Sequence, residues 1–218
     1  MATEVVCDLS GCHGGSYLNA LRLISEAKAA GADAIKWQAF MPEQLAAKRA
    51  KNPRVVALAK DFHGRSLLDL YRETYTPREW FEPMIEHAKS VDIPWFSSVF
   101  SPDDVAFLEM LNCPRYKISA FEMLDGDLIN AVVATGKPII ISVRPVDGVT
   151  ILRATEYDDK EDGALGVSDH SANMRFVSYR CPMVERHLRL PDVPCHDEAF
   201  SSTPDEFREY VKAIRAMK

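Results

Sequence analysis

Strand-like and helix-like segments alternate along the first two-thirds of the chain, and this alternation limits the possible folds more than any other feature. Apolar runs rich in β-formers occupy residues 4–10, 33–40, 94–100, 115–121 and 138–143, and segments with apolar residues at helical spacing follow most of them. Strands that alternate with helices predict a parallel sheet. Because several runs are almost continuously apolar, both faces of that sheet should be covered.

The pattern changes after Val143. Three further runs have the composition of strands, at residues 149–155, 164–170 and 183–188. The segments between them are too short or too polar for full helices, and a last helix begins near Thr203, whose spacing from Glu206 predicts a capping box. We therefore predict an α/β fold: a parallel (β/α)8 TIM-type barrel, trimmed, with helices missing after strands 5 and 6, as one domain over residues 1–218. An open doubly wound sheet is the alternative.

The connection between the fifth and sixth predicted strands is very short. Only RPVDG separates Val143 from Val149, whereas a return between parallel neighbours usually takes a dozen or more residues and a helix. The outward side chains of these strands, such as Ile139, Ile141 and Ile151, should then lack a cover within the chain. Exposed apolar patches of several hundred Å² usually mark interfaces. We therefore expect a homodimer or another oligomer.

Composition excludes several classes of function. The chain has 26 Lys and Arg against 32 Asp and Glu, a formal charge of −6, which argues against a nucleic-acid or membrane-surface binder. No apolar run approaches the roughly 20 residues of a membrane span, and the first residues lack signal-peptide features, so we expect a cytoplasmic protein. The five cysteines show no CxxC spacing and are expected to be free thiols.

Polar residues gather where the predicted strands end. Active sites of parallel barrels form at the carboxyl ends of the strands, so these residues are the first candidates for a site. They are Asp8, Lys36, Gln38, Ser97, Ser98, Lys117, Ser119, Glu122, Arg144, Thr155, Glu156, Ser168, Asp169, His170, Glu185 and His187.

Lys36 and Lys117 each alternate with apolar neighbours and should therefore point to the barrel interior. Buried ammonium groups need an anion, and the hydroxyls of Ser98 and Ser168 would help them hold a phosphate or a carboxylate. Each lysine could instead extend to solvent.

His170 and His187 lie on the last two predicted strands, which should be neighbours. Two imidazoles on adjacent strand ends can share one divalent metal ion, with Asp169 and Glu185 nearby to orient them. A structural role for both histidines remains open. The other candidates, His63, His87 and His196, have no such context and are expected at the surface.

Several stretches together resemble one family. AGADAIKWQAFMPEQL, PRYKISAFEMLDGDLINAVVATGKPIIIS, LGVSDHS, VERHL and DEAFSSTPDEF are similar, in this order, to the phosphoenolpyruvate-dependent sialic acid synthase (N-acetylneuraminate synthase) family. The resemblance implies a barrel in which phosphoenolpyruvate condenses with an N-acetylated amino sugar, an N-acetylmannosamine-like aldose. The product is a sialic-acid-type nonulosonic acid and phosphate is released. It also implies a divalent metal, usually Mn²⁺, with Mg²⁺ or Co²⁺ as alternatives.

The resemblance assigns roles to individual residues. It implies metal ligation by His170 and His187 and catalytic roles for Asp8, Lys117 and His187. It also implies substrate-binding roles for Lys36, Gln38, Ser98, Ser119, Glu122, Tyr157, Ser168 and Asp197.

The chain also departs from the family. Asp8 replaces a glutamate, Cys12 an asparagine and Ala120 a serine, and Glu156 adds a negative charge near the expected phosphate. We also expect the family's C-terminal antifreeze-like domain to be absent. These departures leave a second hypothesis open, a non-catalytic sugar-phosphate or metal-binding barrel that kept the fold. An aldolase or epimerase on an unrelated barrel is a third.

Overall fold

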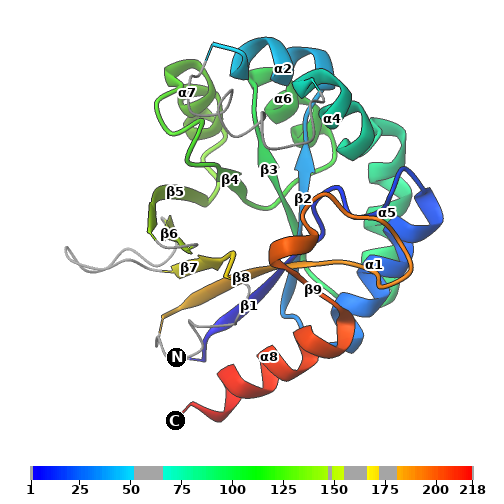
Figure 1. Cartoon of the computed structure of the whole chain (residues 1–218). Coiled ribbons are helices and arrows are strands. Elements are labelled where there is room, and N and C mark those ends of the chain that lie inside the picture. The colour runs from blue at the N-terminus through cyan, green and yellow to red at the C-terminus, as the bar shows by residue number, and fades with distance from the viewer. Residues whose placement is uncertain (1, 52–65, 147–148, 155–165, 172–180, 218) are drawn as a thin grey trace.

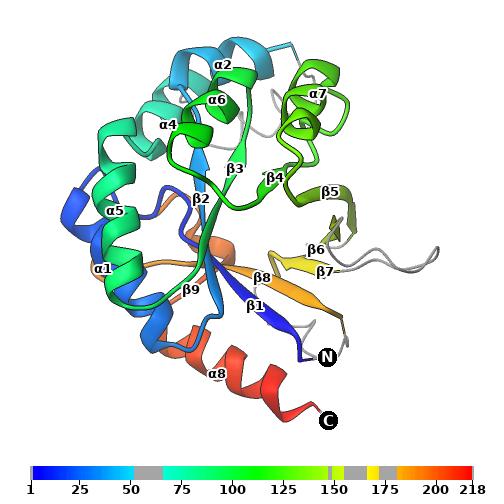
Figure 2. The same ribbon diagram turned by 180° about the vertical axis from the view of Figure 1, so that it is seen from behind.

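The chain forms a curled β-sheet that closes on itself, with helices on its outer face (Figures 1 and 2). This computed structural model describes residues 2–51, 66–146, 149–154, 166–171 and 181–217. The strands are β1 (Glu4–Asp8), β2 (Ala34–Ala39), β3 (Trp95–Val99), β4 (Tyr116–Ile118), β5 (Ile139–Val146), β6 (Val149–Ala154), β7 (Gly166–Asp169), β8 (Met183–Leu188) and the short β9 (Ser201–Ser202). They are hydrogen-bonded in chain order, and β8 also pairs with β1, so the barrel predicted from the sequence is confirmed.

One strand runs against the prediction. β6 pairs antiparallel with both β5 and β7, whereas the other neighbouring pairs are parallel. The cause is the short connection, because two residues between Val146 and Val149 suffice for a hairpin but not for a parallel return. The carboxyl end of β6, Ala154, consequently lies beside Ile140, near the amino end of β5. The prediction of eight parallel strands is therefore wrong for β6, and the second expected helix gap, residues 155–165, lies outside the described residues.

The helices are α1 (Tyr17–Ala29), α2 (Pro42–Arg49), α4 (Leu67–Thr74), α5 (Arg78–Ser90), α6 (Pro102–Met110), α7 (Gly126–Ala134) and α8 (Pro204–Ala216). They cover the sheet from β1 to β5 and beside β8, except α2 and α4, which pack against each other near the ends of β2 and β3. Thr203 and Glu206 form the expected capping box at the start of α8, and Gly31, with a φ of +93°, follows the end of α1. The helices α2 and α4 were not expected from the sequence, although α4 buries Leu70 and Tyr71 on one face.

Strand pleating places the apolar and polar side chains of β2 on opposite faces. Trp37 points outward and packs edge-on against Phe81 of α5, with ring centroids 5.8 Å apart. Lys36, its neighbour in the strand, is buried on the inner face. This alternation is the reason why charged groups enter the barrel without disturbing the outer core.

The flank formed by β5 to β7 differs from the expected one. Ile139 is only 9% exposed and belongs to the main core, so the expectation that it lacks a cover is wrong. Ile141 is half-buried against the same core, and the side chain of Ile151 lies outside the described residues. Among the described helices, none lies over β6 or β7 in Figure 1.

Two of the cysteines are not free thiols. Cys12, after β1, forms a disulfide with Cys195, after β8, and the two Cα atoms are 4.7 Å apart. Chain folding brings them together across a sequence separation of 183 residues, which the spacing could not show. Cys7, Cys113 and Cys181 are free, as expected. Within the described ranges, no helix has the length and apolar character needed to cross a membrane.

Candidate active site

A cavity of about 450 Å³ opens where the parallel strands end. It is lined by most of the residues to which the sequence assigned a role: Asp8, Lys36, Gln38, Ser98, Lys117, Ser119, His170, His187 and Asp197. These residues come from segments far apart in the chain. Barrel closure between β1 and β8 brings the first and last of them together.

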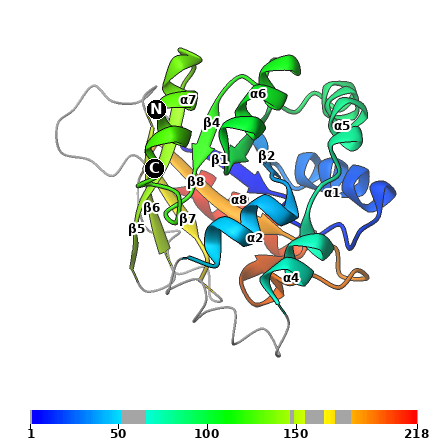
Figure 3. The ribbon, with the colours of Figure 1, turned by 90° about the horizontal axis from the view of Figure 1, so that it is seen from above.

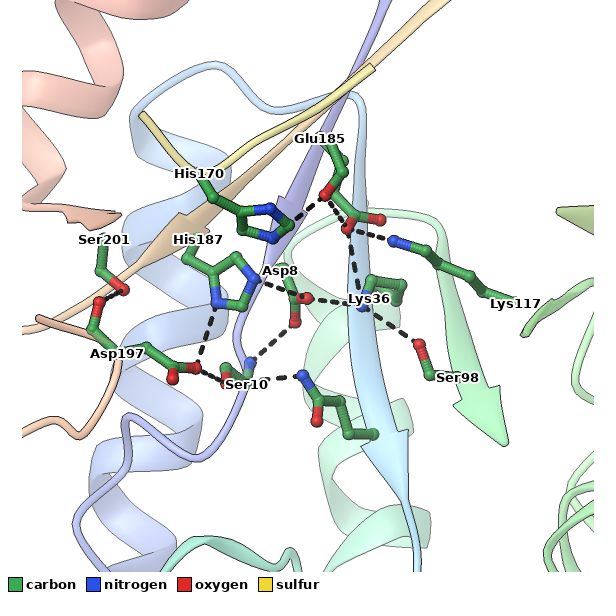
Figure 4. A network of polar contacts seen from close by, with 12 residues as sticks. Asp8, Ser10, Lys36, Ser98, Lys117, His170, Glu185, His187, Asp197 and Ser201 are labelled. Carbon is green, nitrogen blue, oxygen red and sulfur yellow. Dashed lines mark hydrogen bonds and ion pairs between the residues drawn. The ribbon is translucent and has the colours of Figure 1, made fainter. Parts of the chain in front are cut away.

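Buried lysines and carboxylates alternate on the inner wall (Figure 4). The Nζ atom of Lys36 lies 2.5 Å from Oδ2 of Asp8 and 3.8 Å from Oε1 of Glu185. It also donates to the hydroxyl of Ser98 over 3.1 Å. Lys117 donates to the same Glu185 oxygen. Both lysines therefore point to the interior, as their alternation with apolar residues predicted.

The pKa values follow from this pairing. Burial alone raises the pKa of Asp8, but Lys36 and His187 outweigh it and hold that pKa at about 2. Burial likewise raises the pKa of Glu185, and Lys117 and Lys36 bring it below its ordinary value. The pKa of Lys36 is raised, because Asp8 and Glu185 outweigh the effect of burial. The pKa of Lys117 is lowered by burial and by the charge of Lys36, despite Glu185.

The two lysines do not depend on an external anion. Both carry a carboxylate partner within the protein, so Asp8 and Glu185 supply the anions that the buried lysines were expected to need. Glu185 contacts both ammonium groups. A ligand anion would therefore have to share the lysines with Glu185.

The two histidines meet at the ends of β7 and β8. The ring centroids of His170 and His187 are 5.2 Å apart, and both rings pack edge-on against Phe200. Burial is the largest cause that lowers the pKa of His170, to about 3, so this imidazole is neutral at neutral pH. For His187, burial lowers the pKa, but the carboxylates of Asp8 and Asp197 outweigh it and raise the pKa.

The groups that orient these histidines are not the expected ones. Asp8 Oδ2 lies 3.3 Å from Nε2 of His187, and Asp197 Oδ2 lies 3.3 Å from its Nδ1. Ser168 Oγ lies 3.3 Å from Nε2 of His170. Asp169 instead pairs with Arg186, and Glu185 is engaged by the lysines, so both predictions of an orienting role are wrong.

Two of the predicted substrate-binding residues, Glu122 and Ser168, do not line the cavity. Glu122 is buried behind its wall, with both oxygens bound by Arg49. Ser168 is also buried behind the wall and donates to Glu185 over 2.9 Å. Tyr157 lies outside the described residues, as does Glu156.

Sequence reasoning missed several residues of the cavity wall, and three of them are polar or charged side chains that join separate segments. Ser10 donates to Asp197 and so joins the segment after β1 to the segment after β8. His196, expected as a surface residue, lines the cavity, and its Nε2 lies 2.8 Å from Glu73 of α4. Arg49 lines it from the end of α2. Of these three, only Ser10 stands at the end of a predicted strand, where the strand-end rule applied.

The two imidazoles have the chemistry of a divalent-metal site. Their rings are neighbours and His170 is neutral, whereas Nδ1 of His187 lies 3.3 Å from Oδ2 of Asp197 in an ion-pair contact without hydrogen-bond geometry. Among the residues that the structure describes, no set of three or more His, Cys, Asp or Glu side chains forms a complete ligand cluster. The histidines therefore fit a metal ion whose remaining ligands come from solvent or substrate.

Comparison with known proteins places this site in a family. The model of the NeuB family matches residues 23–145. The chain belongs to the NeuB family. This NeuB-family chain is 30% identical to the pseudaminic acid synthase of Helicobacter pylori, over 97% of this chain and 73% of that protein. It is 28% identical to the pseudaminic acid synthase of Campylobacter jejuni, over 97% of this chain and 72% of that protein.

Solved structures agree on the fold. The N-acetylneuraminic acid synthetase of Leptospira borgpetersenii superposes with a TM-score of 0.76 at 17% identity, covering 99% of this NeuB-family chain and 83% of that one. A truncated 3-deoxy-D-arabino-heptulosonate 7-phosphate synthase of Thermotoga maritima superposes with a TM-score of 0.64 at 9% identity. The match covers 98% of this chain and 86% of that one. At these identities the likeness concerns the barrel alone.

Proposed function

We propose that this NeuB-family chain is a phosphoenolpyruvate-dependent synthase that extends an N-acetylated amino sugar to a nonulosonic acid. The methylene carbon of phosphoenolpyruvate forms the new C–C bond to the sugar's aldehyde carbon, whose oxygen takes up a proton. Water adds to the enol-derived carbon, and the bond from that carbon to the phosphate oxygen breaks. The products are the extended sugar acid and inorganic phosphate, so one phosphoenolpyruvate, one aldose and one water are consumed.

One observation carries this proposal. A single cavity is lined both by two lysines and by two histidines. The lysines lie on β2 and β4, in the first part of the chain, and the histidines lie at the ends of β7 and β8, near its end. Lysine ammonium groups and serine hydroxyls suit the phosphate and carboxylate of phosphoenolpyruvate, and imidazoles suit a divalent ion. The relatives named as pseudaminic acid synthases support the same reaction class.

Each cavity residue has a proposed role in this reaction. Lys36 and Lys117 hold the anionic substrate, and Ser98 adds a hydroxyl from the next strand. Asp8 is ionised at neutral pH, because its pKa is held at about 2, so it accepts a proton or hydrogen bond at the sugar end and does not donate one. His170 and His187 would hold the divalent ion, which when bound polarises the sugar's carbonyl.

A second candidate function rests on a specific observation. Lys36 and Lys117 already have carboxylate partners, and Ala120, which lines the cavity, offers no hydroxyl to a phosphate. Both features weaken anion binding. A non-catalytic barrel that binds a sugar phosphate or a metal would keep the cavity and lack turnover.

Release of phosphate from phosphoenolpyruvate separates the two candidates. The purified protein would be incubated with Mn²⁺, phosphoenolpyruvate and a panel of N-acetylhexosamines, with each component omitted in turn. The synthase should release phosphate only when all are present. Lys117→Met should weaken phosphoenolpyruvate binding far more than sugar binding, whereas Lys137→Met, a control on the outer surface, should change neither. Binding of phosphoenolpyruvate without turnover on any sugar would favour the second candidate.

A further inference from the structure

One partly buried cation of the cavity wall has no part in the function proposed above. Arg49 lies at the end of α2, which packs side by side with α4 (Figure 3). Its side chain is 14% exposed and lines the cavity, whereas that of its partner Glu122 is 1% exposed and does not. Arg49 is therefore the member of the pair that a ligand can reach, and Glu122 holds it in place.

The hydrogen bonds of Arg49 leave donors available. Its Nε donates to Oε1 of Glu122 over 2.9 Å, and its Nη2 to Oε2 over 3.0 Å. Its Nη1 donates to the hydroxyl of Tyr71 over 3.2 Å. An arginine carries five N–H groups, so one N–H on each terminal nitrogen has no partner among the described residues. Within the described part of the chain, these two groups are available to an oxygen atom of a ligand or of water.

The charge of the pair decides which oxygen fits. Glu122 binds the guanidinium through two parallel hydrogen bonds and neutralises it. A second anion would gain little there, because the Glu122 carboxylate would repel it. A neutral acceptor such as an amide carbonyl carries no such cost, and it would still receive a hydrogen bond from a charged donor.

The surroundings of Arg49 are apolar. The Cζ atom lies 5.2 Å from the ring centroids of Phe100 and Phe121 and 5.8 Å from that of Tyr71. Leu70 and Leu45 belong to the same apolar cluster as Phe100 and Tyr71, and they also line the cavity. The wall therefore offers fixed N–H donors surrounded by apolar surface, which suits a carbonyl oxygen that carries a small alkyl group.

From this geometry we infer that Arg49 is a specificity-determining residue that recognises the acylamino group of the sugar. The guanidinium donates to the acyl carbonyl oxygen, and the acyl methyl group packs against Phe100 and Leu70. This inference rests on the proposed function, because it names the part of the same substrate that reaches the end of α2.

The test compares sugars with and without the acyl group. Calorimetric titration with Mn²⁺ present would measure the affinity for N-acetylmannosamine, mannose and phosphoenolpyruvate. The test variant is Arg49→Met/Glu122→Gln, which removes the cation without leaving its carboxylate charged and buried. The matched control is Arg72→Met/Glu43→Gln, which removes an exposed pair between the same two helices.

Wild type and control should bind N-acetylmannosamine with about 10- to 100-fold higher affinity than mannose, because a hydrogen bond from a charged donor contributes about that factor. The test variant should bind both sugars with equal affinity and keep its affinity for phosphoenolpyruvate. The assignment would be overturned if the test variant still preferred N-acetylmannosamine, or if its affinity fell equally for both sugars or only for phosphoenolpyruvate. It would also be overturned if the wild type bound neither sugar. If the preference depends on Arg49 but no phosphate is released, the binding role stands and the proposed reaction fails.

Discussion

Replacement of Glu185 by glutamine gives the sharpest test of how the cavity is held together. The Glu185 carboxylate is buried and contacts the ammonium groups of both Lys36 and Lys117. Glutamine has almost the same shape, so the change removes the charge and creates no void. Lys36 retains Asp8 at 2.5 Å, whereas among the described residues Lys117 has no second carboxylate partner.

The expected effect is large. Removal of one partner from a buried ion pair costs about 3–5 kcal/mol of the free energy of unfolding, because the other charge is left buried and uncompensated. Since Lys36 keeps Asp8 as a partner, we expect the free energy of unfolding to fall by about 3 kcal/mol, the lower end of this range. The same change should improve anion binding, because Glu185 no longer competes for the lysines. Phosphate at 100 times its dissociation constant would then restore about 2.7 kcal/mol.

Urea unfolding followed by circular dichroism, in buffers with and without inorganic phosphate, measures both effects. The control Glu86→Gln breaks an exposed pair with Lys89, and its free energy of unfolding should change by less than about 0.5 kcal/mol. An unchanged free energy of unfolding in Glu185→Gln would show that the buried pairing adds nothing. A phosphate response equal to that of the wild type would show that the lysines do not form an anion site.

Four further predictions concern other residues. His170→Ala should abolish Mn²⁺ binding in calorimetry and leave the circular dichroism spectrum unchanged; tight binding by the variant would refute its role as a ligand. Asp8→Glu should retain phosphate release and Asp8→Asn should lose it, and equal turnover in both would make the carboxylate structural. Burial lowers the pKa of His13 from 6.5 to about 4, so the native state keeps it neutral while the unfolded chain takes up a proton. His13 by itself should therefore lower the free energy of unfolding by about 3 kcal/mol from pH 6.5 to pH 4, and His13→Gln should make this part of the urea-unfolding profile less steep by that amount. Reduction of the disulfide should lower the free energy of unfolding of the wild type by about 2–4 kcal/mol, and Cys195→Ser should not respond to the reductant.

The sequence alone determined the barrel and most of the polar lining of its cavity. Strand and helix periods are local properties, and residues at the ends of parallel strands must share one end of a barrel. The inward direction of Lys36 and Lys117 followed from the same strand alternation. The adjacency of His170 and His187 followed from the order of the last two strands.

Only the tertiary structure decided which groups contact one another. The direction of β6 depended on whether two residues could complete a turn, and the disulfide and the Lys36–Asp8 pair depended on barrel closure between β1 and β8. Arg49 could not be found from strand ends, because it reaches the cavity from a helix in a segment without a clear pattern. Local periodicity specifies the face on which a side chain lies, but charge pairing depends on distances of a few ångströms between segments far apart in the sequence, and folding alone sets those distances.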